Sequence, residues 1–545
     1  MTRKLTTSLF AVFALVTLTS IFASAESQHL LTNHVRPATS NGQARLISHM
    51  SASQTLRLDV VLAMRNSEGL DRLLDQLYDP SNPNFRHFLT VKEFTEKFGP
   101  SQEDYDAVVR YAKANGFEVV GGTRDRMDVQ IKGSVETIEK AFHVSMGLYQ
   151  HPTENRTFYA LDREPTVDLP IQLWHISGLE NFGIPRPTFS KRTQPNTLAQ
   201  TGSCPQASFC GSDMRAAYYG GTAFDGTGQN VGLLEYAGFD IDDVNTYYTN
   251  VGQTRTAAVT GISTDGTPLS CLARQGCDDT EQTLDITQAL GMAPGLTTVY
   301  MYVGSSDTAL LAAMSSDQPL PAQLSASWIW DPSDPQTDNP YFKKMAAQGQ
   351  NYFQASGDDA KFNSGYPTWP CDAAYVTSVG GTDLVTASAG GPWKSESAWQ
   401  DSGGGFWAAD GIPIPSWQKA AAKSCASCSQ TYRNAPDVSA NSNWSFYVCA
   451  DQSGCTANEY GGTSFAAPMW AGYLALVNQK RAQNGLKSAG FINPTIYSIA
   501  GGKSYGKYFH DITSGSNGYP ATVGYDLVTG WGSPVAGNPI FGDMR

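Results

Sequence analysis

The sequence predicts two unlike folded parts, an α+β domain followed by a larger α/β domain built on a doubly wound parallel sheet. Between residues 50 and 180, segments of helical period together with strand-like segments indicate a compact α+β unit. After residue 205, short β-rich runs alternate with helical stretches, which is typical of a parallel sheet with active residues at the carboxyl ends of its strands. All nine cysteines lie in the second part.

Hydrophobic periodicity gives the expected elements of each part. In the first part it predicts helices over 69–78, 101–115 and 135–142, and strands over 56–64, 117–120 and 126–131. In the second part it predicts strands over 231–235, 298–303, 323–329 and 352–356, and helices over 281–290 and 341–348. Gly291 is expected to end the helix over 281–290, because glycine commonly follows the last helical residue.

Composition excludes several classes of protein. The chain has 545 residues, 41% of them hydrophobic, so it is neither disordered nor fibrous. Its net charge of -13 leaves no basic footprint for a polyanion, and we expect no nucleic-acid partner.

The first 25 residues have the pattern of a secretory signal peptide. Arg3 and Lys4 precede an apolar run over 9–22, and Ala23-Ser24-Ala25 follows as a small-residue cleavage site. A membrane anchor is the alternative, but the run falls short of the roughly 20 apolar residues that span a bilayer. We therefore expect a secreted, extracellular protein with no membrane contact after removal of residues 1–25.

The cysteines are spaced as short disulfide-closed loops, which an exported chain favours. The close pairs are Cys204 and Cys210, Cys271 and Cys277, Cys425 and Cys428, and Cys449 and Cys455. Cys371 is left over. A zinc site at Cys425 and Cys428 would lack a second ligand pair nearby.

A Pro-rich, polar segment over 182–203 separates the two parts. It contains the basic pair Lys191-Arg192 and has the composition of an exposed, cleavable linker. The expected organisation is a signal peptide at 1–25, a first domain at 26–181, a linker with a processing site at 182–203, and a second domain at 204–545.

Ser464 is the sharpest candidate for chemistry. It follows Gly461-Gly462-Thr463 at the start of an apolar helix pattern, where the helix dipole and free N–H groups favour a developing anion. The alternative is a serine that only caps the helix. A nucleophilic serine needs a base, and seven of the eight histidines precede the linker, which leaves only His510 after it. The base is therefore expected to be a carboxylate.

Glu281 and Asp285 are the candidate carboxylates. They lie four residues apart in the predicted helix, so they share one face, and two close carboxylates tend to share a proton. The alternative is an acidic, solvated helix start that the helix dipole favours.

Six segments in register, together with residues 51–180, resemble the sedolisin family of serine-carboxyl peptidases, kumamolisin-like and with an activation prodomain. The segments are GGTSFAAP at 461–468, ExxxD at 281–285, ASGD at 355–358, VGGT at 379–382, SGGGF at 402–406 and PDVS at 436–439. The resemblance implies a subtilisin-like α/β catalytic domain preceded by an α+β, ferredoxin-like prodomain.

The resemblance also implies roles for four residues. Ser464 would be the nucleophile, Glu281 the general base and acid, and Asp285 the carboxylate that orients Glu281. Asp358 would donate a hydrogen bond to the oxyanion, which requires its carboxyl to be protonated. Acid operation follows, because a Glu near its ordinary pKa of about 4.3 is half-ionised only in acid.

One Ca²⁺ is a further implication. Carboxylates and carbonyls on flexible loops suit calcium, and the last part of the chain supplies both. The family's ligands correspond to the carboxylates of Asp511 and Asp526 and to the carbonyls of Ile512, Thr522 and Gly524.

The sequence departs from the family pattern in two places. Ile329 replaces a glycine in the segment that resembles a substrate-binding edge strand, and we expect it to narrow a subsite. Ala360 stands where a glycine often follows the aspartate by two residues.

The expected function is that of a monomeric, self-processing zymogen of an acid-acting endopeptidase. Its partners would be protein or peptide substrates and its own prodomain, acting as intramolecular inhibitor and folding aid. A tripeptidyl peptidase and a catalytically silent secreted binding module are the alternatives. A separate hypothesis assigns acid release of the prodomain to His143 or His175, buried neutral at the domain interface, with carboxylate titration as its rival.

Overall fold

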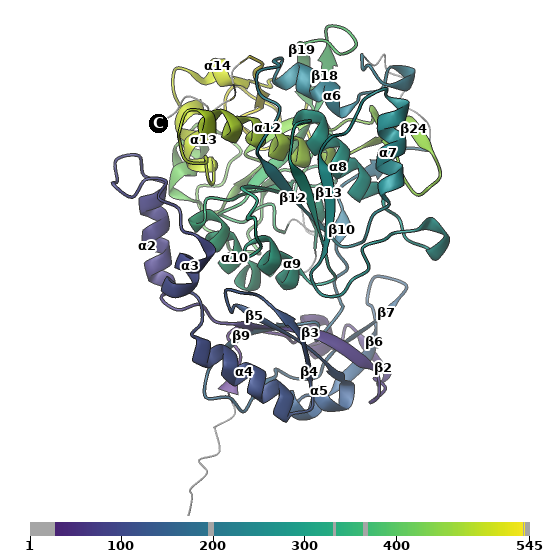
Figure 1. Ribbon diagram of the computed structural model, residues 1–545, viewed down its shortest axis with the longest axis vertical. Coiled ribbons are helices and arrows are strands. Elements are labelled where there is room, and N and C mark those ends of the chain that lie inside the picture. The colour runs from purple at the N-terminus through teal and green to yellow at the C-terminus, as the bar shows by residue number, and fades with distance from the viewer. Residues whose placement is uncertain (1–27, 194–200, 331–333, 363–368, 538, 540–545) are drawn as a thin grey trace, which may run out of the picture.

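The computed structural model describes residues 28–193, 201–330, 334–362, 369–537 and 539, and it forms two domains (Figure 1). The expected signal peptide at 1–25 lies outside these residues, as does part of the linker. In the described part of the chain, no helix combines the length and apolarity needed to cross a bilayer.

The N-terminal domain is an α+β unit, as the sequence predicts. A four-stranded antiparallel sheet in the order β4-β5-β3-β9 packs its apolar face on the helices, and a smaller sheet has the order β2-β6-β7. The bounds are β1 (Gln28–His29), α1 (Pro37–Ser40), β2 (Arg45–His49), β3 (Thr55–Leu62), α2 (Ser67–Leu77), α3 (Val91–Lys97), α4 (Gln102–Ala114), β4 (Glu118–Gly122), β5 (Asp128–Ser134), α5 (Val135–Phe142), β6 (Met146–Gln150), β7 (Thr157–Leu161), β8 (Thr166–Val167) and β9 (Leu173–Ser177).

The C-terminal domain is built on an eight-stranded sheet that is parallel except at β19. Its order is β13-β14-β12-β15-β17-β18-β19, with β22 paired in parallel to β18, which confirms the α/β prediction. The strand bounds are β12 (Asn230–Glu235), β13 (Ala258–Ser263), β14 (Thr298–Val303), β15 (Gln323–Ala326), β17 (Asn351–Ala355), β18 (Thr377–Thr386), β19 (Trp393–Ala398) and β22 (Val438–Asn441). The main helices are α6 (Gly211–Tyr218), α7 (Ile241–Asn250), α8 (Thr280–Met292), α9 (Asp307–Met314), α10 (Pro335–Ala347), α12 (Thr463–Gln483) and α13 (Asn493–Ala500).

Two expectations about element bounds are wrong. Gly291 does not end its helix, because α8 continues to Met292. Instead, Gly291 lies where α6 crosses α8, and a Cβ on it would come within 2.4 Å of the Gly211 backbone. The expected strand over 323–329 is interrupted at Ser327, which separates β15 from the short β16 (Trp328–Ile329).

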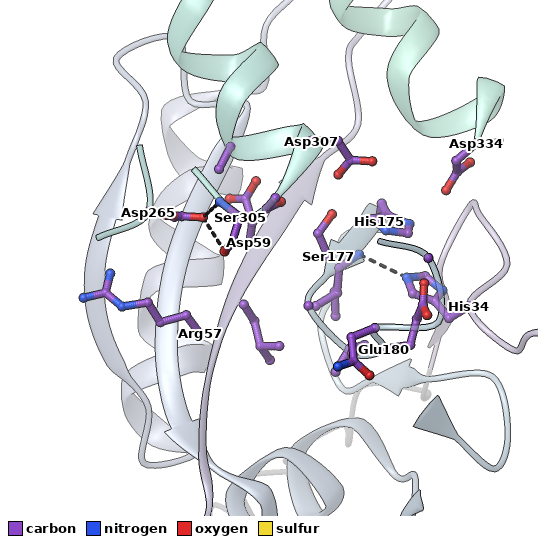
Figure 2. Close-up of a pocket in the computed structure, with 18 of the residues that line it drawn as sticks. His34, Arg57, Asp59, His175, Ser177, Glu180, Asp265, Ser305, Asp307 and Asp334 are labelled. Atoms are coloured by element: carbon purple, nitrogen blue, oxygen red, sulfur yellow. Dashed lines mark hydrogen bonds between the residues drawn. The ribbon is translucent and has the colours of Figure 1, made fainter. Parts of the chain in front are cut away.

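The two domains share a buried polar interface. Asp125 of the N-terminal domain and Lys344 of α10 form an ion pair in which both side chains are fully buried. Alongside it, α2 packs on α10, and Tyr78 donates a hydrogen bond of 2.7 Å to the Ala346 carbonyl (Figure 1). A cavity of about 310 Å³ remains between the domains, with Asp59 and Asp307 in its lining (Figure 2).

The two histidines proposed as acid sensors differ in position. His143 ends α5 on the outside of the domain with 45% of its side chain exposed, so the expectation that it is buried is wrong. His175 is half-buried beside the cavity, where its ring stacks on His34 at 4.4 Å (Figure 2). Burial, with the nearby His34 and Arg36 charges, holds the pKa of His175 well below its ordinary value. The hypothesis therefore remains a prediction for His175 alone.

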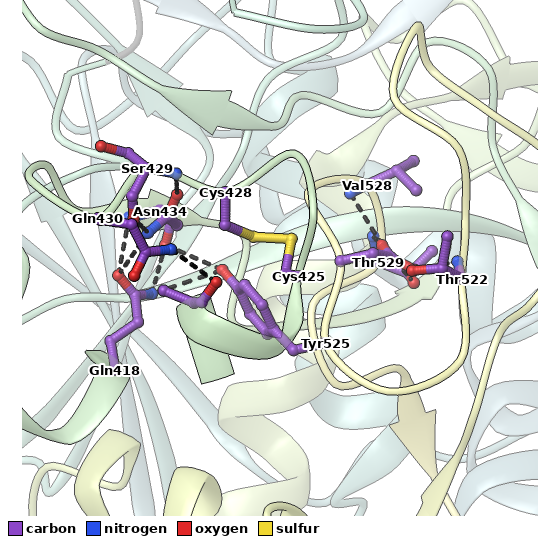
Figure 3. Close-up of a disulfide and its surroundings, with 12 residues drawn as sticks. Gln418, Cys425, Cys428, Ser429, Gln430, Asn434, Thr522, Tyr525, Val528 and Thr529 are labelled. Atoms are coloured by element: carbon purple, nitrogen blue, oxygen red, sulfur yellow. Dashed lines mark hydrogen bonds between the residues drawn. A yellow bond between two sulfur atoms is a disulfide. The ribbon is translucent and has the colours of Figure 1, made fainter. Parts of the chain in front are cut away.

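Four disulfides close the short loops that the cysteine spacing predicts. They join Cys204 to Cys210, Cys271 to Cys277, Cys425 to Cys428 (Figure 3) and Cys449 to Cys455. The disulfide at Cys425 leaves no thiolate pair for zinc there. Cys371 is a free, buried thiol.

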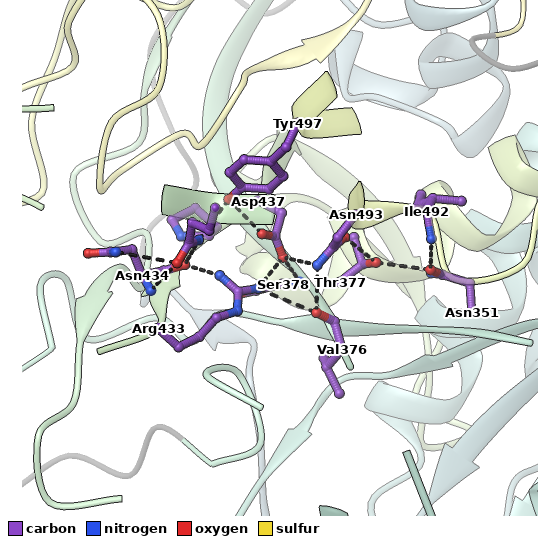
Figure 4. Close-up of polar contacts among 12 residues, drawn as sticks. Asn351, Val376, Thr377, Ser378, Arg433, Asn434, Asp437, Ile492, Asn493 and Tyr497 are labelled. Atoms are coloured by element: carbon purple, nitrogen blue, oxygen red, sulfur yellow. Dashed lines mark hydrogen bonds and ion pairs between the residues drawn. The ribbon is translucent and has the colours of Figure 1, made fainter. Parts of the chain in front are cut away.

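A buried polar network fixes the PDVS segment at 436–439, where the chain enters β22 (Figure 4). Asp437 accepts hydrogen bonds from Arg433 at 2.5 Å, Asn493 at 3.0 Å and Tyr497 at 2.8 Å. Because both oxygens of the Asp437 carboxylate are used and the guanidinium is fully buried, this segment has a structural role in joining β22 to α13.

Candidate active site

Ser464 lies at the start of the buried helix α12, directly after the glycine pair that ends β24 (Cys455–Gly461). Its Oγ donates a hydrogen bond of 3.0 Å to Glu281 Oε2 on α8. Gly462 has a φ of 143°, and a Cβ there would lie 2.5 Å from Asp358 Oδ2 and 2.5 Å from the Thr188 carbonyl oxygen. The glycine therefore lets the peptide chain and a carboxyl approach the serine together.

Glu281 and Asp285 lie side by side on α8, as their spacing predicts, but they are buried rather than solvated. Asp285 Oδ1 accepts a hydrogen bond of 2.8 Å from Ser327 Oγ. The remaining oxygens, Glu281 Oε1 and Asp285 Oδ2, have no donor among the described residues. Burial raises the pKa of Asp285 to about 8, and burial together with the Asp285 charge raises that of Glu281 well above its ordinary value. One shared proton would satisfy both free oxygens.

Glu235 is a third carboxylate of this group, and it is not among the site residues predicted from the sequence. It is the last residue of β12, and its Oε2 accepts a hydrogen bond of 3.0 Å from Trp328 Nε1. Burial and the Asp285 charge raise its pKa well above the ordinary value. A signal was available, because Glu235 ends a strand that periodicity predicts and parallel strands present active residues at that end.

Asp358 follows β17 and has two unlike oxygens. Oδ1 accepts hydrogen bonds from Thr463 N at 2.8 Å and Thr463 Oγ1 at 3.0 Å. Oδ2 is buried and has no partner in the part of the chain that the structure describes. Burial raises the pKa of this carboxyl well above its ordinary value, so the group is protonated in acid and Oδ2 can donate.

The linker passes through this site as an extended strand. On one side of Ser464, β10 (Arg186–Pro187) pairs antiparallel with β16. On the other side, β11 (Ser190–Lys191) pairs antiparallel with β24. Thr188 lies between them, and its carbonyl oxygen accepts a hydrogen bond of 3.1 Å from Ser464 N. The Thr188 carbonyl oxygen thus contacts the Ser464 backbone, and it lies on the same side of Gly462 as Asp358 Oδ2, because a Cβ on Gly462 would be 2.5 Å from both oxygens.

Ile329 and Ala360, the two residues that depart from the family pattern, both lie at constrained positions. Ile329 is buried and pairs with Arg186 of the linker, so it lies against the bound chain. Ala360 has a φ of 62°, the left-handed conformation that a glycine would adopt more readily.

The candidate calcium residues lie close together on one loop. Asp511 accepts hydrogen bonds from Gly524 N at 3.1 Å and Tyr505 at 3.2 Å, and Asp526 accepts one of 2.8 Å from Thr522 N. Within the described ranges, no hydrogen bond is made to the carbonyl oxygens of Ile512, Thr522 and Gly524. Two carboxylates and three uncommitted carbonyls are a donor set that fits Ca²⁺. The described residues contain no group of three or more carboxylate, histidine or cysteine ligands.

Comparison with known proteins identifies both domains. Residues 43–182 match the pro-kumamolisin activation domain, and residues 284–497 match the subtilase family. Kumamolisin from Bacillus sp. (strain MN-32) is 27% identical, over 94% of this chain and 95% of that protein. Tripeptidyl-peptidase 1 from Canis lupus familiaris is 26% identical, over 90% of this chain and 91% of that protein.

A solved structure of Pseudomonas sedolisin, a serine-carboxyl proteinase, is similar to this chain. The match has a TM-score of 0.51 and 25% identity, and it covers 62% of this chain and 96% of the sedolisin chain. The chain therefore belongs to the sedolisin family of serine-carboxyl peptidases, with an activation domain preceding a subtilase-like catalytic domain.

Proposed function

We propose that the chain is the secreted zymogen of an acid-acting serine-carboxyl endopeptidase, and that it processes itself by cleaving the Thr188–Phe189 bond. One observation carries this proposal. The linker is held as a strand on both sides of Ser464, with the Thr188 carbonyl oxygen 3.1 Å from Ser464 N. A reacting carbonyl needs this position beside a nucleophile and an oxyanion donor.

In the proposed reaction, Ser464 Oγ attacks the carbonyl carbon of Thr188 while Glu281 takes the serine proton. The bond to the Phe189 nitrogen then breaks, that proton passes to the nitrogen, and Thr188 is left as an ester on Ser464. Water hydrolyses the ester with Glu281 again taking and returning a proton. The products are a carboxylate at Thr188 and a new amino terminus at Phe189.

Asp285, Glu235 and Asp358 support this chemistry from fixed positions. Asp285 shares a proton with Glu281 and orients it, and Glu235 keeps Trp328 and the neighbouring strand in place. Asp358 donates from Oδ2 to the developing oxyanion, which it does only while protonated. Activity should therefore fall as pH rises through the raised pKa of Asp358.

Endopeptidase action is favoured over tripeptidyl-peptidase action by the path of the linker. Thr188, Pro187 and Arg186 occupy the three positions before the bond, and the chain continues without a break toward the activation domain. A cleft that accepts this chain does not require a free amino terminus three residues before the bond.

Calcium and secretion complete the proposal. Asp511 and Asp526, with the carbonyls of Ile512, Thr522 and Gly524, would hold one Ca²⁺, which would supply stability to the loop at 511–526 rather than a step of the reaction. The signal-peptide pattern at 1–25 and the four disulfides support export to an oxidising compartment.

The test uses an unfolded protein substrate and matched peptides with free and acetylated amino termini, at about pH 4 where carboxylates titrate. We expect the activated wild type to cleave the protein substrate and the acetylated peptide, and Ser464→Ala and Glu281→Gln to lose both activities by several orders of magnitude. Cleavage of the free peptide alone would identify a tripeptidyl peptidase. Inactivity of a correctly folded wild type on every substrate would identify a silent binding module.

A further inference from the structure

We propose that Trp444, Tyr460 and Glu459 form a cation-binding subsite on the leaving-group side of the cleft. It would select peptide and protein substrates with basic residues at the third and fourth positions after the scissile bond. The inference rests on the proposed function, in which Thr188–Phe189 is the bond cleaved and Lys191 and Arg192 occupy those two positions.

The third position is filled by Lys191, whose ammonium group lies over the Tyr460 ring, 4.8 Å from its centroid. The Glu459 carboxylate is 3.9 Å from the same ammonium. Tyr460 itself is buried, while half of the Lys191 side chain is exposed. The Tyr460 ring and the Glu459 carboxylate thus form one side of a site that a cation can enter from solvent.

The fourth position is filled by Arg192, whose guanidinium lies over the Trp444 ring, 3.5 Å from its centroid. The Arg192 main chain is fixed by a hydrogen bond of 2.9 Å from its N to the Glu459 carbonyl oxygen. The carboxylates of Asp383 and Asp401 interact electrostatically with this guanidinium. Stacking on tryptophan is the strongest form of the cation–π contact, and arginine is the usual partner.

Trp444 also contacts the catalytic domain itself. Trp444 is 9% exposed and packs edge-on against Trp399, with ring centroids 5.2 Å apart. Its indole N–H donates a hydrogen bond of 2.8 Å to Ser190 Oγ, at the second position after the bond. An aromatic ring that contacts consecutive positions of the bound strand can discriminate between substrate side chains at these positions.

The basic residue before the bond is held differently and provides a control. Arg186 makes its ion pair with Glu154, a residue of the activation domain, at 2.6 Å. That contact is absent once the activation domain has left, and among the described residues only the electrostatic interaction of Arg186 with Asp359 of the catalytic domain remains. We therefore expect a basic residue at this position to contribute much less to cleavage in trans.

The test compares three peptides spanning residues 182–193, blocked at both ends. The first has the natural sequence, the second carries Lys191→Gln and Arg192→Gln, and the third carries Arg186→Gln. With activated wild-type enzyme we expect kcat/KM for the second peptide to be about 5- to 30-fold lower than for the first. The third should be within about twofold of the first, since an exposed ion pair contributes little.

Any segment that remains bound after self-processing competes equally with all three peptides, so the ratios of kcat/KM are unaffected. Two enzyme variants test the residues. Trp444→Ala should bring the ratio of the first two peptides close to one. Glu459→Gln, on a partly exposed side chain that should not affect folding, should lower the ratio by about two- to threefold.

The outcomes separate the inference from the proposed function. A reduced ratio in both variants supports the subsite. Equal cleavage of the natural and Gln-substituted peptides by wild type would overturn the subsite and leave the proposed function standing. Failure of wild type to cleave any of the three peptides between Thr and Phe would overturn both.

Discussion

The two carboxyl oxygens of Asp358 lie in different surroundings. Oδ1 is fixed by Thr463 N and Oγ1, so the carboxyl cannot rotate freely, and Oδ2 is left buried without a partner among the described residues. Such a group is costly to bury as an anion and is therefore kept protonated. The geometry that makes the carboxyl a good donor is the same geometry that raises its pKa.

Replacing Asp358 tests this role. Asp358→Ala removes the donor and should lower kcat by about 100- to 1000-fold. Asp358→Asn keeps a neutral donor of similar shape, so it should retain more activity. Its activity should also decline less at high pH, because an amide does not ionise. The measurement is the pH profile of kcat for the three proteins, and equal losses in both variants with intact circular dichroism would assign Asp358 a purely structural role.

The sequence allowed some residues of the site to be predicted and not others. Ser464, Glu281, Asp285 and Asp358 each stand in a short local motif, and the structure brings these four together. Thr188 stands in no motif. Its position on Ser464 depends on the register between the linker and β16, which distant hydrogen bonds set.

Helix α8 shows how packing against neighbouring elements constrains the residues of a helix. It presents Glu281 and Asp285 on one face, and at its other end Gly291 allows α6 to cross at backbone contact. The prediction that this glycine ends the helix was wrong because a glycine within a helix can serve packing rather than termination. Periodicity alone cannot distinguish these two uses.

Gly291→Ala should therefore destabilise the domain. The added Cβ would lie 2.4 Å from the Gly211 backbone, and such overpacking costs about 1–3 kcal/mol. Denaturant unfolding in a Ser464→Ala background, which prevents self-digestion, measures the loss. Gly506→Ala is the matched control, since nothing lies within 4 Å of its Cβ position. Equal stability of the two variants would contradict the packing role of Gly291.

The loop at 511–526 provides a second prediction at this scale. A ligand that binds only the folded state stabilises it by mass action, so removing Ca²⁺ should lower the melting temperature of the mature enzyme. Asp511→Ala should have the same effect and should make the protein insensitive to the chelator. The measurement is thermal unfolding with and without EDTA, at a pH where EDTA binds calcium. An unchanged melting temperature in the wild type would contradict the proposal that the folded enzyme is stabilised by bound Ca²⁺.

Over the whole molecule, buried carboxyls set the pH dependence of stability. Burial raises the pKa values of Glu235, Glu281, Asp338 and Asp358 well above their ordinary range, and that of Asp285 to about 8. The same groups titrate near pH 4 in the unfolded chain. Between these values the folded state binds more protons, so the free energy of unfolding should fall as pH rises from about 4 to about 8. His175, with its lowered pKa, acts in the opposite direction below about pH 6.5.

Denaturant unfolding of the Ser464→Ala precursor at pH 4.5, 6 and 7.5 would measure this dependence. Asp285→Asn in the same background should flatten it, because the amide does not titrate. Higher stability at pH 7.5 than at pH 4.5 would contradict the raised pKa values of these carboxyls in the folded protein.

The arrangement of the two domains lay beyond sequence reasoning. The alternation of elements predicted each fold, because period and turn chemistry are local. The interface depends on contacts between residues far apart in the chain, such as the ion pair of Asp125 with Lys344 and the apolar cluster that includes Leu74 and Phe342, which have no local signature. His143 and His175 both lie in apolar sequence surroundings, yet His143 is exposed and His175 lies half-buried in the lining of the cavity between the domains.

We propose that Ser464 cleaves the Thr188–Phe189 bond of its own chain. The most direct test is to incubate the purified precursor at about pH 4, where its carboxylates titrate, and to determine the amino-terminal sequence of the product over time. We expect a new chain beginning Phe189-Ser190-Lys191 and an uncut Ser464→Ala precursor under the same conditions. A first cut at another bond of the wild type, or equally fast processing of Ser464→Ala, would contradict it.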